Sequence, residues 1–369
     1  RLPARLCHAF CGGWCGPHCC FCIVSAVFGQ GAGELNPLTD YERLVSHIEA
    51  ALPAVHRFAP PTPVLRLRWL DALIDGTVFL KAECLQATGS FKIRGALNVM
   101  TPLEQQQSVD RVVAFSSGNH GIGVAYAAKC LKMLASVVVP SDAPRRKVDR
   151  IRSLGAEIIF YDRHTENREH IAEALCRGTG AMLVKPYDDW RTIAGQGTCG
   201  AEAHWQTRGA IDSAIVCTGG GGLIAGIGAY LKAKRGEIAL YSAEPEGWDD
   251  HRLSFEQQSL VAAPASGSTW CDGLLAMAPG EVTLPINLRH NITGLCASDL
   301  AIAHAMRLIW ENFGIALEPS GAIALACLMT SPSLFSGKRV LVTLTGSNVD
   351  SAAFESALTL AGQTAQPNH

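Results

Sequence analysis

A lysine at position 92 stands where an amine could do covalent chemistry. Residues 78–83 form an apolar run that predicts a strand, and the segment SFKIRGALN at 90–98 predicts a helix that begins at Lys92. The helix dipole disfavours positive charge at a helix amino terminus, so we expect a lowered pKa for this amine. A neutral amine is the form that imine chemistry requires. The alternative, for the lysine taken alone, is a surface side chain or a phosphate contact.

A polar turn, SSGNHG at 116–121, follows a second predicted strand at 112–116 and opens a helix. Backbone N–H groups converge in such a turn and favour an anion. A substrate carboxylate would suit the turn, with the Asn119 side chain free to reach a further hydroxyl. The alternative is an ordinary turn with a serine cap. The candidate residues are Ser117, Gly118, Asn119 and His120.

Four consecutive glycines follow the predicted strand at 214–218, and a helix is predicted from Leu223. Without Cβ atoms, this backbone could approach a phosphate from several sides. A competing interpretation is the GxGxxA pattern of dinucleotide-binding sites, with Glu244 at the end of the next strand as the acid that binds a ribose. The glycine pattern alone leaves both interpretations open. The dinucleotide pattern would use Gly220, Gly222 and Ala225.

These three turns need a scaffold that brings strand ends together. From Tyr41 onward, short β-branched runs alternate with longer segments of helical periodicity, which is typical of a parallel sheet with crossover helices. Ligands of such α/β sheets bind beyond the carboxyl ends of the strands. The residues just after the predicted strands are therefore the first candidates for a site. The other predicted strands are 137–140, 157–161, 182–185, 238–244 and 339–345.

Composition excludes several classes of protein. The chain has 369 residues, 48% of them hydrophobic, so it can bury a sizeable core and divide into two lobes. Its formal net charge of -2, from 31 basic and 33 acidic residues mixed along the chain, offers no surface for a nucleic acid. No apolar run reaches the roughly 18 residues that a membrane span needs. We expect a soluble globular enzyme.

The cysteines fall into two groups. Eight of the fourteen are scattered singly and predict reduced, buried thiols in a cytoplasmic protein. The other six lie within the first 22 residues, where a metal or redox tract and a secretory signal are alternatives. Their spacings match no zinc pattern, so we interpret residues 1–35 as a disordered extension. These six are Cys7, Cys11, Cys15, Cys19, Cys20 and Cys22.

Six motifs in unbroken order, from about residue 38 to 355, are highly specific together. They are SFKIRGALN, SSGNHG, PYDD with AGQGT, GGGGL, EPEGWDD and TGSNVD. This combination resembles the serine/threonine dehydratase family of fold-type II pyridoxal-phosphate enzymes, which includes threonine ammonia-lyase and serine racemase. The resemblance implies two lobes, each with a largely parallel sheet flanked by helices, and a homodimer. The large cofactor-binding domain would be 36–108 with 187–369, and the small domain, closing over substrate, 109–186.

The resemblance also assigns roles within the cofactor site. Lys92 would hold pyridoxal 5'-phosphate as a Schiff base and later take the substrate α-proton, with Phe91 packed beside it. Asn119 would bond the ring hydroxyl, and Thr345 would face the pyridine nitrogen. The phosphate would lie against Gly219, Gly220, Gly221, Gly222 and Leu223.

The resemblance assigns the substrate and a cation in the same way. Ser117, Gly118, Asn119 and His120 would bind the substrate carboxylate, and Ser117 holds the position from which serine racemase protonates the opposite face. The EPEGWDD segment resembles the family's divalent-cation site. Mg²⁺ or Ca²⁺ would suit such oxygen ligands. The alternative is an acidic helix start, capped by Asp249 or Asp250. The cation ligands would be Glu244, Asp250 and the Trp248 carbonyl.

The reaction that follows is removal of water and then ammonia from L-threonine, L-serine or a related 3-hydroxy-amino acid, giving a 2-keto acid. Tyr187 favours dehydration over racemisation, because dehydratases of the family commonly have an aromatic residue there. Arg168 matches an arginine near the racemase site by position only, and we interpret it as an exposed helical residue paired with Glu166 or Glu169. The alternatives are a racemase, a β-replacement enzyme, a nicotinamide dehydrogenase and a non-catalytic relative.

Overall fold

A computed structural model describes residues 37–116, 118–143, 145–264 and 268–363 of the chain. Backbone contacts divide the chain into two compact units, 1–43 and 44–369. Of the first unit only the start of helix α2 (Pro37–His56) is described, and everything below concerns the second. The predicted Cys-rich extension at 1–35 lies outside the described residues. No described helix is both long enough and apolar enough to cross a membrane.

The larger sheet has six strands in the order β1-β2-β10-β7-β8-β9. All neighbours pair in parallel except β1, which is antiparallel to β2. The last strand in sequence, β10, therefore lies between β2 and β7. The strands are β1 (Val64–Leu65), β2 (Thr77–Lys81), β7 (Ser213–Cys217), β8 (Ala239–Pro245), β9 (Thr293–Ala297) and β10 (Arg339–Thr343).

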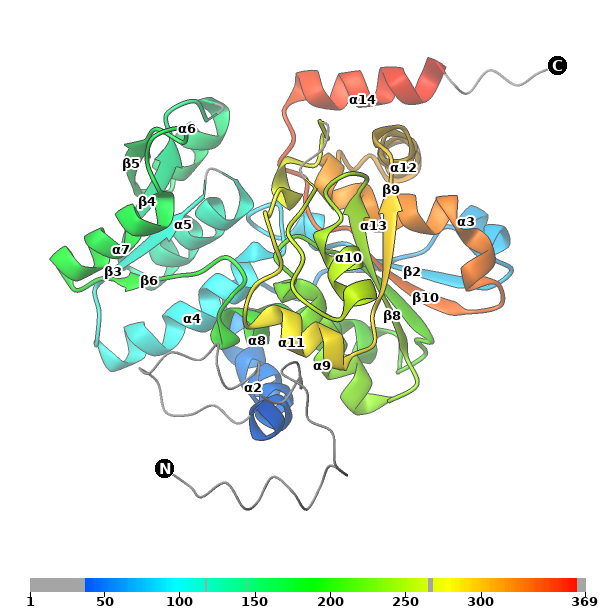
Figure 1. Ribbon diagram of the computed structural model, residues 1–369, viewed down its shortest axis with the longest axis horizontal. Coiled ribbons are helices and arrows are strands. Elements are labelled where there is room, and N and C mark those ends of the chain that lie inside the picture. The colour runs from blue at the N-terminus through cyan, green and yellow to red at the C-terminus, as the bar shows by residue number, and fades with distance from the viewer. Residues whose placement is uncertain (1–36, 117, 144, 265–267, 364–369) are drawn as a thin grey trace, which may run out of the picture. The chain divides into compact units, whose positions relative to one another are not determined.

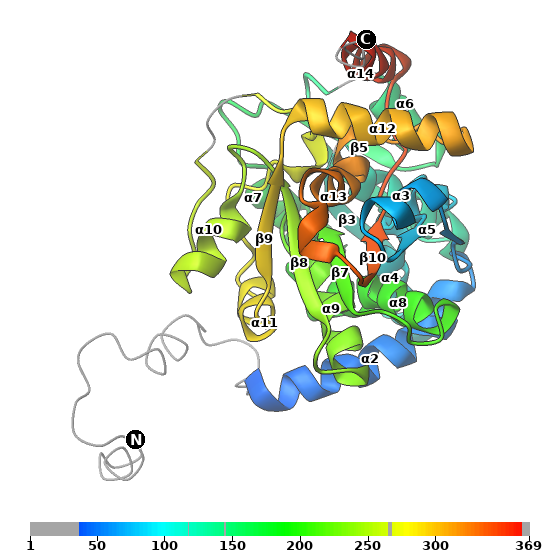
Figure 2. The same cartoon turned by 90° about the vertical axis from the view of Figure 1, so that its right-hand side faces the viewer.

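Both faces of this sheet are buried, which explains why its strands are almost continuously apolar. Along β10, Val340 and Val342 belong to one core while Leu341 belongs to another, as expected when side chains alternate across a strand. The first core includes α3 (Arg68–Leu73), α12 (Asp299–Phe313), α13 (Pro319–Thr330) and η3 (Pro332–Phe335) (Figure 2). The second includes α8 (Trp190–Gln206), α9 (Gly222–Lys234), α10 (Asp250–Gln257) and α11 (Thr283–Arg289).

A smaller sheet is formed within residues 111–183, and its four strands are all parallel, in the order β5-β4-β3-β6 (Figure 1). One face packs against α4 (Lys92–Gln106), α5 (Asn119–Leu131) and α6 (Arg145–Ser153), and the other against α7 (Arg168–Thr179). The strands are β3 (Arg111–Phe115), β4 (Leu134–Pro140), β5 (Glu157–Tyr161) and β6 (Met182–Leu183). The remaining elements are η1 (Glu83–Leu85), η2 (Asp272–Leu274) and α14 (Ser351–Gln363).

The predicted fold class is confirmed: two sheets of mainly parallel strands are flanked by helices. All eight predicted strands form, with ends that shift by at most three residues. Two strands were not predicted, β1 with two residues and β9 with the sequence TGLCA, which is short and only partly buried. The domain boundaries at 108 and 186 stay a prediction, although the smaller sheet falls between them.

Candidate active site

Lys92 is the first residue of α4, as predicted, and Phe91 is its N-cap residue. Lys92 is half-buried, and its amine donates a hydrogen bond to the Pro186 carbonyl at 2.8 Å. It also lies 5.1 Å from the centre of the Phe91 ring. Burial lowers the pKa of Lys92 from 10.5 to about 8. The lowered pKa has the expected direction, and burial is its first cause.

Three segments follow three adjacent strands of the larger sheet, whereas the SSGNHG turn follows β3 of the smaller sheet. The segment that carries Lys92 comes after β2, Thr345 comes after β10, and the tetraglycine turn at 219–222 comes after β7. Because these strands are parallel neighbours, their carboxyl ends meet at one edge. The Phe91 N–H donates to the Thr345 carbonyl at 3.3 Å, so two of the segments touch directly.

The tetraglycine turn has features that only glycine permits. Gly221 has a φ of 87° and precedes α9 as its N-cap residue. A Cβ on Gly220 would lie 2.3 Å from ring atoms of Tyr187, so this ring packs directly on the turn. Thr283 donates its hydroxyl hydrogen to the Gly220 carbonyl at 2.6 Å, and Asn287 donates to the Gly221 carbonyl at 3.3 Å. With these carbonyls engaged, the N–H groups at the start of α9 are suited to a phosphate.

The other predicted cofactor-binding residues lie in the glycine turn, in the core beneath α9, and just after β10. Gly219, Gly220 and Gly222 line the turn between β7 and α9, and Leu223 is buried in the core under α9. Thr345 is buried, and its hydroxyl donates to the Ser320 carbonyl at 3.4 Å. A neutral hydroxyl therefore stands just after the end of β10. A buried amine, a Cβ-free phosphate turn and a hydroxyl at one edge fit pyridoxal phosphate.

The Asn119 turn reaches this edge from the smaller sheet. Asn119 begins α5, and its amide donates to Oε1 of Glu318 while its oxygen accepts from Asn348. Gly118 precedes it, and the Gly118 N–H donates to the Ser116 hydroxyl at 3.1 Å. Ser117 lies outside the described residues. Asn119 is thus joined to the larger sheet's part of the chain, as a site between the two sheets requires.

His120 is a buried, neutral imidazole. Its Nε2 donates to the Val184 carbonyl at 2.8 Å, and its Nδ1 has no hydrogen-bond partner. Burial first, and then the charge of Lys92, lower the pKa of His120 to about 3. The ring therefore cannot neutralise a carboxylate as an imidazolium. Binding of a substrate carboxylate by His120 stays a prediction.

Glu318 is a site residue that the sequence did not suggest. It is buried, and besides Asn119 it accepts the Asn348 N–H at 3.2 Å. Burial raises the pKa of Glu318 to about 7, with a further contribution from Asp272. A cavity of about 380 Å³ opens beside it. The only sequence signal was an acid directly before Pro319, which is typical of an ordinary helix start.

The candidate cation residues meet at the start of α10. Asp250 Oδ2 is buried without a hydrogen-bond partner, and Glu244 is fully buried close to it. Burial and the neighbouring carboxylate raise the pKa of Glu244, and burial raises that of Asp250 to about 7. An orphaned carboxylate oxygen beside a second buried carboxylate fits a hard cation. Within the described residues no cluster of three His, Cys, Asp or Glu side chains forms, so Trp248 would have to contribute its carbonyl, and the cation stays a prediction.

The alternative interpretation of this segment is wrong in its detail. Asp249 makes no side-chain cap of α10 and instead accepts from Arg252 at 2.7 Å. The cap is Glu244, whose two oxygens accept the N–H groups of His251 and Arg252, both at 2.9 Å. Those bonds also argue against the dinucleotide interpretation, because the acid that should bind a ribose is already engaged.

Arg168 begins α7 and is exposed, as predicted. Its guanidinium lies over the Phe115 ring, 5.4 Å from the centre, and no ion pair with Glu166 or Glu169 is found among the described residues. Its charge is close enough to reduce the rise in the pKa of Tyr187 that burial causes. A cation therefore stands near the tyrosine that covers the glycine turn.

Comparisons with known proteins agree with this geometry. The family model described as "Pyridoxal-phosphate dependent enzyme" matches residues 55–346. The L-threo-3-hydroxyaspartate ammonia-lyase of Pseudomonas sp is 40% identical over 302 residues, 82% of this chain and 94% of the relative. The serine racemase of Oryza sativa subsp. indica is 36% identical over 329 residues, 87% and 94% of the two chains. The crystal structure of a T.th. threonine deaminase covers 83% of this chain and 98% of its own, with 37% identity and a TM-score of 0.77.

Proposed function

Since the chain belongs to the pyridoxal-phosphate-dependent enzyme family of fold type II, we propose that it removes water and then ammonia from a small L-3-hydroxy-amino acid. Serine, threonine and threo-3-hydroxyaspartate are the candidates. The observation that carries the proposal is the Lys92 amine, buried at the shared edge of three strands with a pKa of about 8. Roughly a fifth of such an amine is neutral near pH 7.4, which is far more than for an exposed lysine.

Each residue of the site has a proposed task. When bound, pyridoxal phosphate would draw electrons from the substrate Cα and so ease loss of the α-proton and the β-hydroxyl. Lys92 would attach the cofactor and then hold the α-proton at Nζ as general base. Asn119 would orient the ring hydroxyl, Phe91 and Tyr187 would limit access of water, and Thr345 would bond the pyridine nitrogen. The N–H groups at 118–120, with Ser117, would bind the substrate carboxylate.

Arg168 favours threo-3-hydroxyaspartate within the proposed substrate class. A second carboxylate on Cβ would gain from a guanidinium near Tyr187, whereas serine and threonine would not. The names of two relatives, L-threo-3-hydroxyaspartate ammonia-lyase and beta-hydroxyaspartate dehydratase, point the same way. We propose this acid as a substrate alongside serine and threonine. An Arg168→Ala variant should lose turnover of the diacid while keeping turnover of serine.

The deciding experiment presents the purified protein with stereoisomers of serine, threonine, 3-hydroxyaspartate and phenylserine. Keto acid, ammonia and the enantiomer of each substrate are quantified, with a Lys92→Ala variant as control. Keto acid formation that depends on Lys92 supports the proposal. D-serine formed faster than pyruvate would identify a racemase instead, and product that requires added sulfide would identify β-replacement.

Three further features belong to the same proposal. The smaller domain, 109–186, would close over bound substrate and exclude water. Mg²⁺ or Ca²⁺ would bind Glu244, Asp250 and the Trp248 carbonyl and support the packing beneath the glycine turn. The functional protein would be a homodimer in the cytoplasm, with a small amino acid as its partner and neither nucleic acid nor membrane.

A further inference from the structure

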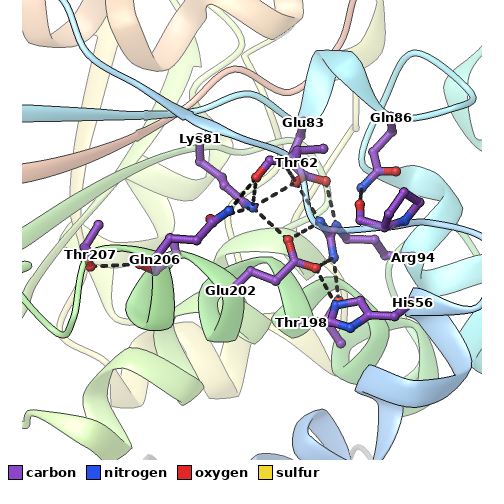
Figure 3. A network of polar contacts seen from close by, with 12 residues as sticks. His56, Thr62, Lys81, Glu83, Gln86, Arg94, Thr198, Glu202, Gln206 and Thr207 are labelled. Atoms are coloured by element: carbon purple, nitrogen blue, oxygen red, sulfur yellow. Dashed lines mark hydrogen bonds and ion pairs between the residues drawn. The ribbon is translucent and has the colours of Figure 1, made fainter.

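Two residues beyond Lys92, Arg94 lies in a cluster of buried charges that the proposed chemistry does not use (Figure 3). Lys81, Glu83, Arg94 and Glu202 have side chains that are at most 1% exposed. Two cations face two carboxylates, and the His56 ring also contacts Glu202 at 2.8 Å. Burying four charges is costly unless each is paired and hydrogen-bonded, so their contacts need to be nearly complete.

Arg94 uses every guanidinium nitrogen against the two carboxylates. Its Nε and Nη2 donate to the two oxygens of Glu83 at 2.6 and 2.8 Å. Its Nη1 and Nη2 donate to the two oxygens of Glu202 at 2.6 and 2.7 Å. Nη1 also donates to the Thr198 hydroxyl at 3.0 Å. Two fork-shaped pairs on one guanidinium need a planar donor set that a lysine lacks.

The rest of the cluster keeps the carboxylates charged. Burial would raise the pKa of Glu202, but hydrogen bonds from Arg94 and the charges of Arg94 and Lys81 lower it to about 2. Lys81 donates to Glu202 at 2.7 Å, to the Thr62 carbonyl at 2.8 Å and to Gln206 at 3.0 Å. The cluster therefore stays ionised across the working pH range and joins β2, α4 and α8.

The buried charges lie on both sides of Lys92 in the sequence. Glu83 lies just after β2 and Arg94 lies in the first turn of α4, so the segment between them, which carries Lys92, is fastened at both ends. The Arg94 N–H donates to the Phe91 carbonyl at 3.0 Å, which ties the backbone of Arg94 to the N-cap residue of the helix. Any rotation of α4 that moved Lys92 would break the two hydrogen bonds between Arg94 and Glu83.

A close helix contact fixes the same turn from the other side. A Cβ on Gly195 of α8 would lie 2.6 Å from the Arg94 carbonyl and 2.8 Å from Cα of Gly95. The two helices therefore cross at backbone distance, directly beside the cluster. The charges themselves are not among the causes of the low pKa of Lys92, which is set by burial. Any effect on Lys92 is thus one of position.

We propose that Arg94 is a positioning residue for Lys92: its double fork to Glu83 and Glu202 fastens the cofactor-bearing segment to β2 and α8. This inference rests on the proposed role of Lys92. A misplacement of about 1 Å at a reacting group can cost on the order of a hundredfold in rate. Loosening the fork should therefore weaken cofactor attachment and turnover more than it weakens substrate binding.

The test uses the purified holoenzyme and three variants of decreasing severity, Arg94→Lys, Glu83→Gln and Thr198→Val. For each, bound cofactor is reduced with borohydride, the fraction on Lys92 is found by peptide mass mapping, and the rate of reattachment after cofactor removal is measured. Steady-state kinetics at saturating cofactor give kcat and KM. We expect reattachment and kcat to fall by on the order of tenfold or more for Arg94→Lys and Glu83→Gln, with KM within about twofold.

The matched control is Asp212→Asn. Asp212 also holds two arginines, accepting from Arg339 at 2.7 Å and Arg235 at 2.9 Å, but it lies before β7, at the opposite end of the strand from the glycine turn. It should lower thermal stability and leave reattachment and kcat within about twofold of wild type. If Arg94→Lys or Glu83→Gln does not fold, the Thr198→Val variant is decisive. Its reattachment rate and kcat should fall in the same way, but by a smaller factor.

The outcomes separate the two proposals. Variants that fold and behave like Asp212→Asn would show that the cluster is structural only, which overturns the inference. A wild-type protein with no borohydride label on Lys92 would overturn the proposed function itself. Label on Lys92 in wild type, together with slow reattachment in the fork variants alone, supports both.

Discussion

The Lys92 amine is where residue chemistry and stability conflict. Burial that makes the amine reactive also makes its protonated form unfavourable in the folded chain. Unfolding restores the ordinary pKa of 10.5, so the unfolded chain binds more protons between pH 8 and 10.5, and stability rises with pH across that window. Below pH 8 the amine is protonated in both the folded and the unfolded chain, and the full cost of burying the charged amine then lowers the free energy of unfolding.

We therefore expect Lys92→Met to stabilise the cofactor-free chain while it abolishes turnover. The gain in free energy of unfolding should be roughly 2–3 kcal/mol near pH 7 and should shrink towards pH 10.5. Urea unfolding of both proteins at several pH values measures it. Equal stability at every pH would show that the amine is solvated.

Among single residues, the sequence suggested candidates that come after predicted strands. It did not suggest Glu318, which comes before a helix. Lys92 and Asn119 begin helices and Thr345 comes just after β10, at places where a polar residue is a candidate for ligand binding. Glu318 opens a helix, where an acid is expected for local reasons, and its bond to Asn119 depends on how two distant segments meet. Burial of Lys92 also depends on how distant segments meet. The direction of its pKa shift was therefore predictable from the sequence, whereas burial as its cause was not.

At the scale of elements, the tetraglycine turn is the most constrained feature. Gly220→Ala would place a methyl group 2.3 Å from atoms of the Tyr187 ring, so the ring or the proposed phosphate-binding turn would have to move. Such overpacking typically costs about 1–3 kcal/mol, which is roughly a ten- to hundredfold loss of cofactor affinity. Fluorescence titration with pyridoxal phosphate checks this. Gly236→Ala, where the new Cβ meets nothing within 4 Å, should bind the cofactor normally.

The start of α10 gives a second prediction for an element. Millimolar Mg²⁺ or Ca²⁺ should raise the thermal midpoint of the protein by about 2–5 °C, because it neutralises the two buried carboxylates of Glu244 and Asp250. Asp250→Asn should lose most of that increase, whereas Asp75→Asn, at an exposed acid, should keep it. Differential scanning calorimetry with and without chelator decides. An unchanged midpoint in wild type would remove the cation from the proposal.

Elements were predictable where hydrophobic pattern and length agreed. Strands such as β7 and β10 are buried on both faces and read as continuous apolar runs, so their existence followed from the sequence. In β9 the side chains are mostly half-buried and one residue is glycine, so the run has neither alternation nor bulk. Its pairing with β8, rather than its own propensity, makes it a strand.

At the scale of the molecule, the two sheets are joined near the site by polar contacts of α6. Lys147 pairs with Asp272, and Arg150 donates to Asn348. The Lys147 side chain is 22% exposed and that of Asp272 56%, so the pair should contribute only about 0.2–1 kcal/mol.

Lys147→Ala should accordingly raise KM by no more than about fivefold, with kcat nearly unchanged, and the difference should fade at high salt. Steady-state kinetics at two ionic strengths test it. Lys129→Ala, at an exposed lysine on α5, should match wild type. A large fall in kcat for Lys147→Ala would mean that this pair positions the reacting groups, and that its role is not limited to the proposed closure of the smaller domain.

Strand order was the part of the architecture that no local pattern could supply. Apolar runs identify strands, but β10 enters between β2 and β7 only because its register with both is satisfied in the folded sheet. Pairing between segments so distant along the chain leaves no mark in either one. The resemblance to a known family supplied the overall plan, and its domain boundaries stay untested.

The central place of β10 has a consequence during translation. Strands β2 and β7, with Lys92 and the glycines that follow them, leave the ribosome long before residues 339–345 are synthesised. Until then the nascent sheet lacks its middle strand and exposes two unpaired edges, a hazard for association with other chains. The edge that the segments after β2, β7 and β10 share is therefore complete only once residues 339–345 have been synthesised.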